Sequence, residues 1–155
     1  GPEALTEAFH KLDPAFTGIV SRRYMLVSRD QTGDNEASAA SLAAVMSRLA
    51  LGKVSDLDAE TGAAIRDAVI ARDDVYGLRG LHWVKGGSLN SDPITRVTSG
   101  WWESPEAGPI VYAIMLSQPD PGSRGRADAS DRLERLASTL SAMILKAARD
   151  DQVER

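Results

Sequence analysis

The segment His82-Trp83-Val84-Lys85-Gly86-Gly87-Ser88-Leu89 decides the fold that we expect for this chain. Large residues alternate along the segment and are followed by a lysine and two glycines. This pattern indicates a β-strand whose regular side-chain pattern is interrupted at the glycine pair. Two further strand-like runs follow at hairpin distance, Thr95–Trp102 and Pro109–Gln118. The simplest arrangement of these three strands is an antiparallel sheet.

The Gly86-Gly87 pair has two interpretations. Glycine weakens the interior of a strand, so the pair indicates either a β-bulge or a place where another molecule approaches the backbone closely. In the first case Lys85 is an ordinary solvated lysine, and in the second it lines a site. His82 alternates with Trp83, which favours a hydrogen-bonded strand histidine over a general base.

Along the chain, the strands of the sheet are expected to follow three helices and to precede one more. Apolar residues at helical spacing predict helices over Glu3–Lys11, from an N-cap at Ser38 to about Leu51, from Asp58 to about Arg72, and from Ser130 to Ala148. The order of elements predicts an α+β fold in which helices precede an antiparallel three-stranded sheet and a long C-terminal helix. We expect a single domain over residues 1–155, with a helical part at 1–75 that includes a long loop at 13–37, and the sheet and last helix at 76–155.

The run Pro109–Gln118 contains seven consecutive residues without polar alternation, Ile110-Val111-Tyr112-Ala113-Ile114-Met115-Leu116. Such a run is typical of a strand that is covered on both faces. We therefore expect this strand to be the central one of the three. Trp101 and Trp102 point to opposite faces of the preceding strand, so one of the two indoles should lie in the core.

Composition excludes several classes of function. A net charge of −4 without a basic cluster argues against a nucleic-acid partner. The chain has no cysteine and only two histidines, so we expect no metal site and no cofactor. No run reaches the roughly 18 consecutive apolar residues of a membrane span, and no signal peptide is recognisable at the first residues.

Two motifs and their order resemble the C-terminal portion of the serine β-lactamase and penicillin-binding protein superfamily, in particular the class A β-lactamases. Gly1-Pro2-Glu3-Ala4-Leu5-Thr6 is similar to the Gly-Pro-x-x-Leu-Thr helix opening that follows the Ser-Asp-Asn motif in these enzymes. Lys85-Gly86-Gly87 stands where the family has a Lys-Thr-Gly or Lys-Ser-Gly triad on the strand that lines the active site. The resemblance implies a β-lactamase/transpeptidase-like fold.

The same resemblance assigns roles to the strand. Lys85 would be the catalytic residue that places positive charge beside the nucleophile and the substrate carboxylate. Gly86, Gly87 and Ser88 would bind substrate, with Ser88 supplying a backbone N–H of the oxyanion hole. Gly86 lacks the hydroxyl that the family has at this position, and Ser88 and Ser91 are the candidates to replace it.

The chain lacks the remaining catalytic motifs of the family. It contains no Ser-x-x-Lys and no Ser-Asp-Asn, and the loop at 13–37 has no Glu-x-x-x-Asn. The resemblance and these absences together imply that the chain is a portion of a hydrolase of small-molecule or peptide substrates, which the resemblance places in the periplasm or outside the cell. Alone it should be inactive, and it should self-associate or bind a complementing N-terminal segment. The alternative is a noncatalytic binding or interaction domain that retains the fold.

Overall fold

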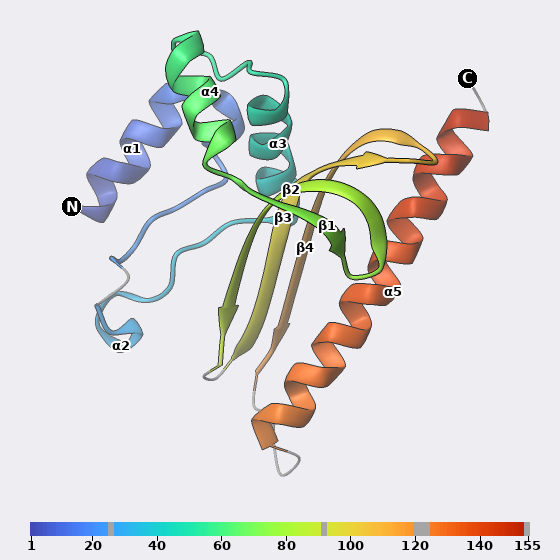
Figure 1. Cartoon of the computed structure of the whole chain (residues 1–155). Helices are drawn as coiled ribbons and strands as arrows, with labels where there is room; N and C mark the ends of the chain where they lie inside the picture. Colours follow the sequence, from blue (N-terminus) through green and yellow to red (C-terminus); the bar gives the residue numbers. More distant parts are fainter. Residues whose placement is uncertain (25–26, 91–92, 120–124, 154–155) are drawn as a thin grey trace. The chain divides into compact units, whose positions relative to one another are not determined.

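The computed structural model describes residues 1–24, 27–90, 93–119 and 125–153 (Figure 1). They form an α+β arrangement of helices, one antiparallel sheet and a long C-terminal helix. Contacts within the chain group into two compact units, Gly1–Ala68 and Val69–Arg155. We describe each unit by itself.

The first unit is helical. Its elements are α1 (Pro2–Leu12), the 3-10 helix η1 (Pro14–Phe16), α2 (Arg29–Thr32), α3 (Ala39–Ala50) and α4 (Ala59–Asp67). Helix α1 ends at Asp13, which is extended because the residue before a proline is pushed out of the helical region. The side chains of Ser38 and Asp58 accept the backbone N–H groups of Ser41 and Thr61, so both predicted helix starts are confirmed.

The Asp13 carboxylate joins three segments of the first unit. It is 0% exposed and accepts hydrogen bonds from Ala15 N at 2.8 Å, Ser55 N at 2.9 Å and Ser55 Oγ at 2.7 Å. Arg48 Nε of α3 lies 3.6 Å from Asp13 Oδ1. The hydrogen bonds from Ala15 and Ser55 hold the pKa of this carboxyl below its ordinary value. The charge of Asp13 thus fixes η1 and residue 55 beside α3.

The second unit contains a sheet of four strands, where we predicted three. The strands are β1 (Ile70–Val75), β2 (Leu78–Leu89), β3 (Ile94–Ser104) and β4 (Gly108–Gln118), in the spatial order β1-β2-β3-β4, and every neighbouring pair is antiparallel. Helix α5 follows at Gly125–Val153 and is longer at both ends than the predicted helix.

The additional strand replaces the end of a predicted helix. Helix α4 ends at Asp67 instead of about Arg72, and Ile70–Val75 pairs with the first half of β2. The connection is a two-residue turn in which Tyr76 and Gly77 have φ angles of +52° and +84°, the signs that a type I′ hairpin turn requires. Pairing with β2 therefore overrides the helical periodicity of this stretch.

Strand β4 lies at the edge of the sheet, so the prediction that it is central was wrong. The central strand of the last three is β3, which pairs with β4 along its whole length and with β2 from Thr95 to Glu103. An apolar run indicates that the two faces of a strand are screened from water. It says nothing about the backbone edges, which decide how many neighbouring strands it has.

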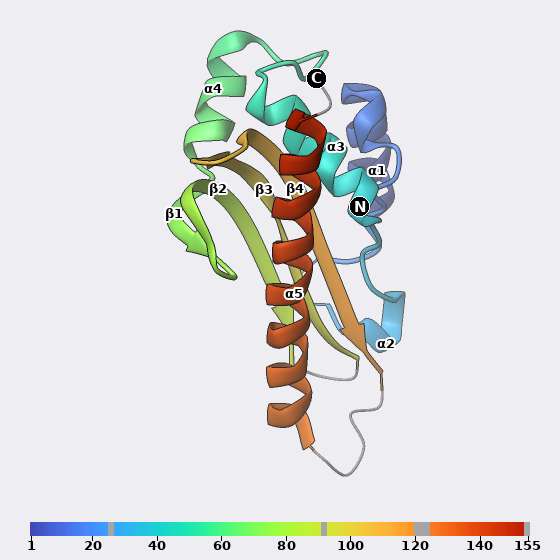
Figure 2. The same cartoon turned by 90° about the vertical axis from the view of Figure 1, so that its right-hand side faces the viewer.

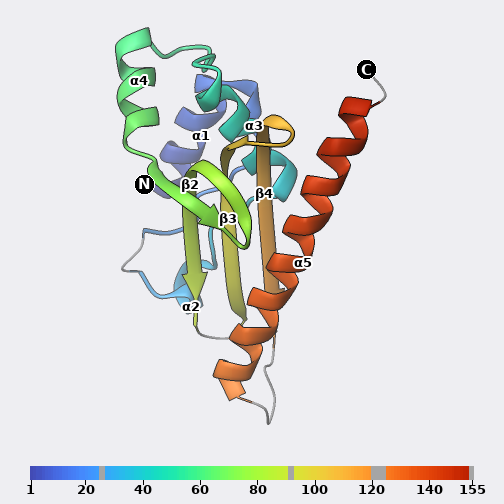
Figure 3. The same cartoon turned by 45° about the vertical axis from the view of Figure 1, so that its right-hand side comes forward.

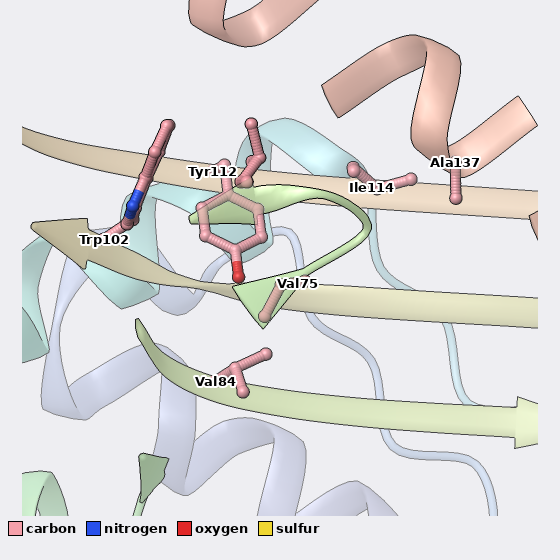
Figure 4. Packing of buried hydrophobic residues seen from close by; sticks show 7 residues of the cluster. Val75, Val84, Trp102, Tyr112, Ile114 and Ala137 are labelled. Atoms are coloured by element: carbon pink, nitrogen blue, oxygen red, sulfur yellow. The ribbon is translucent and has the colours of Figure 1, made fainter. Parts of the chain in front are cut away.

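Helix α5 covers one face of the sheet, and we call this the helix face (Figures 2 and 3). The core beneath it contains Trp102, Tyr112 and Ile114 of the sheet and Ala137 of α5, as Figure 4 shows. Trp102 is 2% exposed and its indole N–H donates to Arg79 O at 2.9 Å. The prediction that one indole lies in the core is therefore confirmed.

His82 lies in this core as a fully hydrogen-bonded histidine, as its sequence context indicated. Its Nε2 lies 2.9 Å from the Leu78 carbonyl oxygen and its Nδ1 lies 3.1 Å from the Tyr112 hydroxyl. A carbonyl can only accept, so Nε2 carries the proton and Nδ1 accepts from Tyr112. The ring also stacks on Trp102, with centroids 5.2 Å apart.

Candidate functional site

The second half of β2 has one free backbone edge. Residues His82–Val84 pair with β1 on one side and β3 on the other, whereas Lys85–Leu89 pair only with β3 in the part of the chain that the structure describes. Lys85, Gly86, Gly87 and Ser88 are all exposed. In an antiparallel pair every second residue directs its N–H and C=O groups to the free edge, so two of these four residues carry backbone donors and acceptors that a ligand can use.

The two glycines do not form a bulge. The register between β2 and β3 is unbroken, with Lys85 opposite Ser99, Gly86 opposite Thr98 and Gly87 opposite Val97. The bulge interpretation of the sequence was therefore wrong.

The fold itself gives no reason for glycine at either position. Neither Gly86 nor Gly87 has a positive φ angle. A Cβ at Gly87 would meet nothing within 4 Å, and one at Gly86 would lie 3.7 Å from Val97 O, an ordinary contact. The missing side chains instead leave open space beside the strand edge.

A hollow of about 500 Å³, which we call the β2 hollow, runs along this edge. This volume falls within the range of roughly 300–1,000 Å³ that small-molecule sites occupy. The β2 hollow is lined by all four residues that the sequence indicated as candidate site residues, Lys85, Gly86, Gly87 and Ser88. The remaining lining residues are Arg72, Asp74, Val75, Tyr76, Val84, Asn90, Arg96, Val97, Thr98 and Glu134.

Lys85 is available for an anionic ligand. Its Nζ donates to Gly86 O at 2.8 Å, and it forms no ion pair with the residues that the structure describes. Val84 is buried in the core, so by strand alternation Lys85 and Gly87 point away from the helix face, and Gly86 and Ser88 lie on it. The strand edge therefore offers free backbone groups, with the Lys85 ammonium on the face away from α5. No serine hydrogen-bonds to Lys85 within the described residues, so these groups form no nucleophile and base pair.

The wall opposite the strand edge was not predicted from the sequence. It consists of residues of β1 and the β1–β2 turn, chiefly Arg72, Asp74 and Tyr76. The Tyr76 hydroxyl lies 3.1 Å from Thr98 Oγ1, which places the turn over the helix face of β3. A hairpin signal was present in the sequence: Tyr76-Gly77 stands between two short runs that contain valine or leucine. The helical periodicity of the preceding residues, which predicted a helix to about Arg72, obscured this signal. Ser91 lies outside the described residues.

No protein-family model matches the sequence, and no curated protein matches it. None of the helices in the described ranges is long and apolar enough to cross a membrane. Within the same ranges, no three histidine or acidic side chains are grouped in a way that would hold a metal ion.

Proposed function

We propose that the chain is a portion of a serine hydrolase related to the β-lactamases and penicillin-binding proteins, and that Lys85–Ser88 is the substrate-binding wall of its active site. The observation that carries this proposal is the free edge of β2 at Lys85–Ser88, with two glycines that the fold does not require, beside a hollow of about 500 Å³. The order of helices, antiparallel strands and terminal helix is consistent with the fold that the motifs imply.

The proposed roles follow from the chemistry of these groups. A β-lactam, peptide or ester substrate carries a carbonyl and, in many cases, a carboxylate. The Lys85 ammonium would attract the carboxylate, and the free N–H groups of the strand edge would bind the carbonyl oxygen and stabilise the charge that develops on it. Glycines at 86 and 87 would let the substrate approach the backbone without a steric clash.

The nucleophile would come from residues outside this sequence, because no serine of the chain stands in a Ser-x-x-Lys motif. We therefore expect this chain to bind substrate weakly and not to turn it over. The alternative function is a binding domain without catalysis, which would use the same hollow. A Ser-x-x-Lys motif upstream in the same reading frame would favour the hydrolase, and a start codon at this point would favour the binding domain.

The test is an amide NMR titration of the ¹⁵N-labelled chain with benzylpenicillin. We expect saturable shifts centred on Lys85–Ser88, and their loss in Gly87→Val, whose side chain fills the space beside the edge. Gly62→Val, in α4 of the other unit and also without a close neighbour, serves as the matched control for adding this side chain.

Intact mass spectrometry after the titration checks the chemistry. We expect no covalent adduct. Shifts that centre on another part of the chain, or no shifts at all, would overturn the assignment of the wall. An acylated serine would contradict the statement that the nucleophile lies outside this sequence.

A further inference from the structure

The β2 hollow has a second polar wall, which we call the turn end: the β1–β2 hairpin folds over the helix face and brings Tyr76 to Thr98, the partner of Gly86. The turn is held there by the contact of Tyr76 with Thr98, and Asp74 Oδ1 fixes its conformation by accepting Gly77 N at 2.9 Å. Val75 and Val84, which are 7% and 4% exposed, supply apolar surface between the two ends. This end therefore combines a rigid turn, an aromatic ring and apolar side chains.

Most charges around the hollow already have partners. Arg96 Nε lies 3.5 Å from Glu134 Oε1, and the Arg96 guanidinium also donates to the carbonyl oxygens of Leu89 and Thr95. The Arg96 side chain is only 14% exposed. We regard this pair as a structural contact between β3 and α5.

Arg72 differs from Arg96 because its guanidinium has no hydrogen bond and no ion pair within the described part of the chain. It stands opposite His82 in the register, so its side chain leaves the strand on the helix face. Burial raises the pKa of the Tyr112 phenol, Tyr76 adds to this rise, and the charge of Arg72 opposes it. Arg72 is thus an exposed cation directed to the turn end of the hollow.

We propose that the turn end of the β2 hollow binds a carboxylate through Arg72, and that this carboxylate belongs to a ligand with a small apolar or aromatic body. The planar guanidinium matches the two oxygens of a carboxylate, and such charge-assisted pairs are stronger than neutral hydrogen bonds. The apolar body contacts Val75, Tyr76 and Val84. Asp74 adds a negative charge at the same end, so the site selects a single carboxylate over a more highly charged anion.

This inference goes beyond the proposed function, because it concerns the hairpin wall of the hollow and requires no catalytic step. Lys85 lies three residues beyond the partner of Arg72 on β2, about 10 Å along the strand. Arg72 lies on the helix face and Lys85 points to the opposite face, so the two cations act on separate ligand groups. The two ends can be tested separately.

The test is a ¹⁵N NMR titration of the whole chain with 3-phenylpropionate, followed at the Arg72 Nε–Hε signal and the Tyr76 amide. The neutral comparison is 3-phenylpropionamide, which has the same shape. We expect the carboxylate to bind about tenfold or more tightly than the amide. In Arg72→Gln this preference should disappear, and in Arg72→Lys it should be partly retained. Arg79→Gln is the matched control, because Arg79 is exposed on the same hairpin and does not line the hollow.

Three results would overturn the proposal. They are equal binding of the acid and the amide by the unaltered chain, a preference that survives in Arg72→Gln, and the absence of saturable shifts at Arg72 with millimolar probe. The first and third results need no variant, so they remain decisive if Arg72→Gln fails to fold. The benzylpenicillin titration with Gly87→Val reports on the strand-edge end, and its failure would leave the Arg72 result unaffected.

Discussion

Gly100 of β3 and Gly87 of β2 are glycines for different structural reasons. Gly100 of β3 lies where a Cβ would be 2.2 Å from Trp83 O, so β2 can approach β3 only because this residue has no side chain. Gly87 of β2 faces open space. The first glycine is therefore required by the sheet, and the second is left for a ligand under the proposed function.

The two glycines should respond oppositely to alanine. Gly100→Ala should lower the free energy of unfolding by about 1–3 kcal/mol, because the backbone of β2 must move. Gly87→Ala should leave it unchanged or raise it by up to about 1 kcal/mol, because alanine restricts the unfolded chain. Urea unfolding followed by tryptophan fluorescence measures both, since Trp83, Trp101 and Trp102 all lie in the second unit. A large loss in Gly87→Ala would show that the fold needs this glycine.

His82 should make the second unit sensitive to acid. Burial lowers the pKa of its imidazole, while the Leu78 carbonyl and the Asp74 charge partly oppose this shift. The unfolded chain, with a histidine pKa of about 6.5, therefore takes up a proton at a higher pH than the folded chain. The contribution of His82 to stability is complete above about pH 6.5 and is lost as the pH falls through the lower folded pKa.

The measurement is the urea midpoint of tryptophan fluorescence between about pH 7.5 and about pH 5. We expect the midpoint to fall over this interval in the unaltered chain and to fall less in His82→Gln, which cannot take up the proton. An equal fall in both chains would assign the acid sensitivity to other groups.

At the scale of elements, Asp13 connects the helices of the first unit. Its carboxylate accepts from residues on both sides of α3, namely Ala15 and Ser55, and it does so without exposure to water. Removal of the carboxylate leaves the partly buried N–H groups of Ala15 and Ser55 without this partner, which costs more than the loss of a fully exposed hydrogen bond. Local hydrogen bonds within each helix cannot replace this contact, because it joins residues 42 positions apart.

Asp13→Ala should therefore loosen α1, η1 and residue 55 together. Hydrogen exchange followed by mass spectrometry should show faster exchange in peptides that cover these elements. Asp56→Ala is the control, because Asp56 is exposed and adjacent in sequence to Ser55. Comparable exchange in the two variants would contradict the role of Asp13.

At the scale of the whole molecule, the sheet ends at an apolar edge strand. Strand β4 pairs with β3 only, and its other edge has no strand partner among the described residues. It is 11 residues long and contains no charged residue. Long apolar edges of this kind promote pairing with another chain unless charges or prolines interrupt them.

We expect the chain to self-associate through β4, with a sedimentation coefficient that rises with concentration. Ala113→Lys places a charge in the middle of this strand and should shift the chain toward monomer. Ala142→Lys makes the same change on an exposed position of α5 and should have no effect. Monomeric behaviour of the unaltered chain at high concentration would remove β4 as an association site.

The sequence by itself determined the features that depend on neighbouring residues. Pro14 ends α1, Ser38 and Asp58 cap α3 and α4, and alternation along a strand sends one of the two neighbouring indoles to the core face, because backbone sterics and side-chain capping act over a few positions. The exposed lysine and glycines of β2 were also recognisable as a candidate site, since their residue types alone distinguish them from an ordinary strand.

The tertiary structure decided which strands are neighbours and what lies opposite the site. Ile70–Val75 pairs as a strand although its local pattern continues a helix, and β4 lies at an edge although its faces are apolar. Arg72 and Tyr76 reach the β2 hollow because the hairpin folds over the helix face. Strand pairing depends on backbone groups of distant residues, which all residue types share, so the order of side chains along the chain cannot specify it alone.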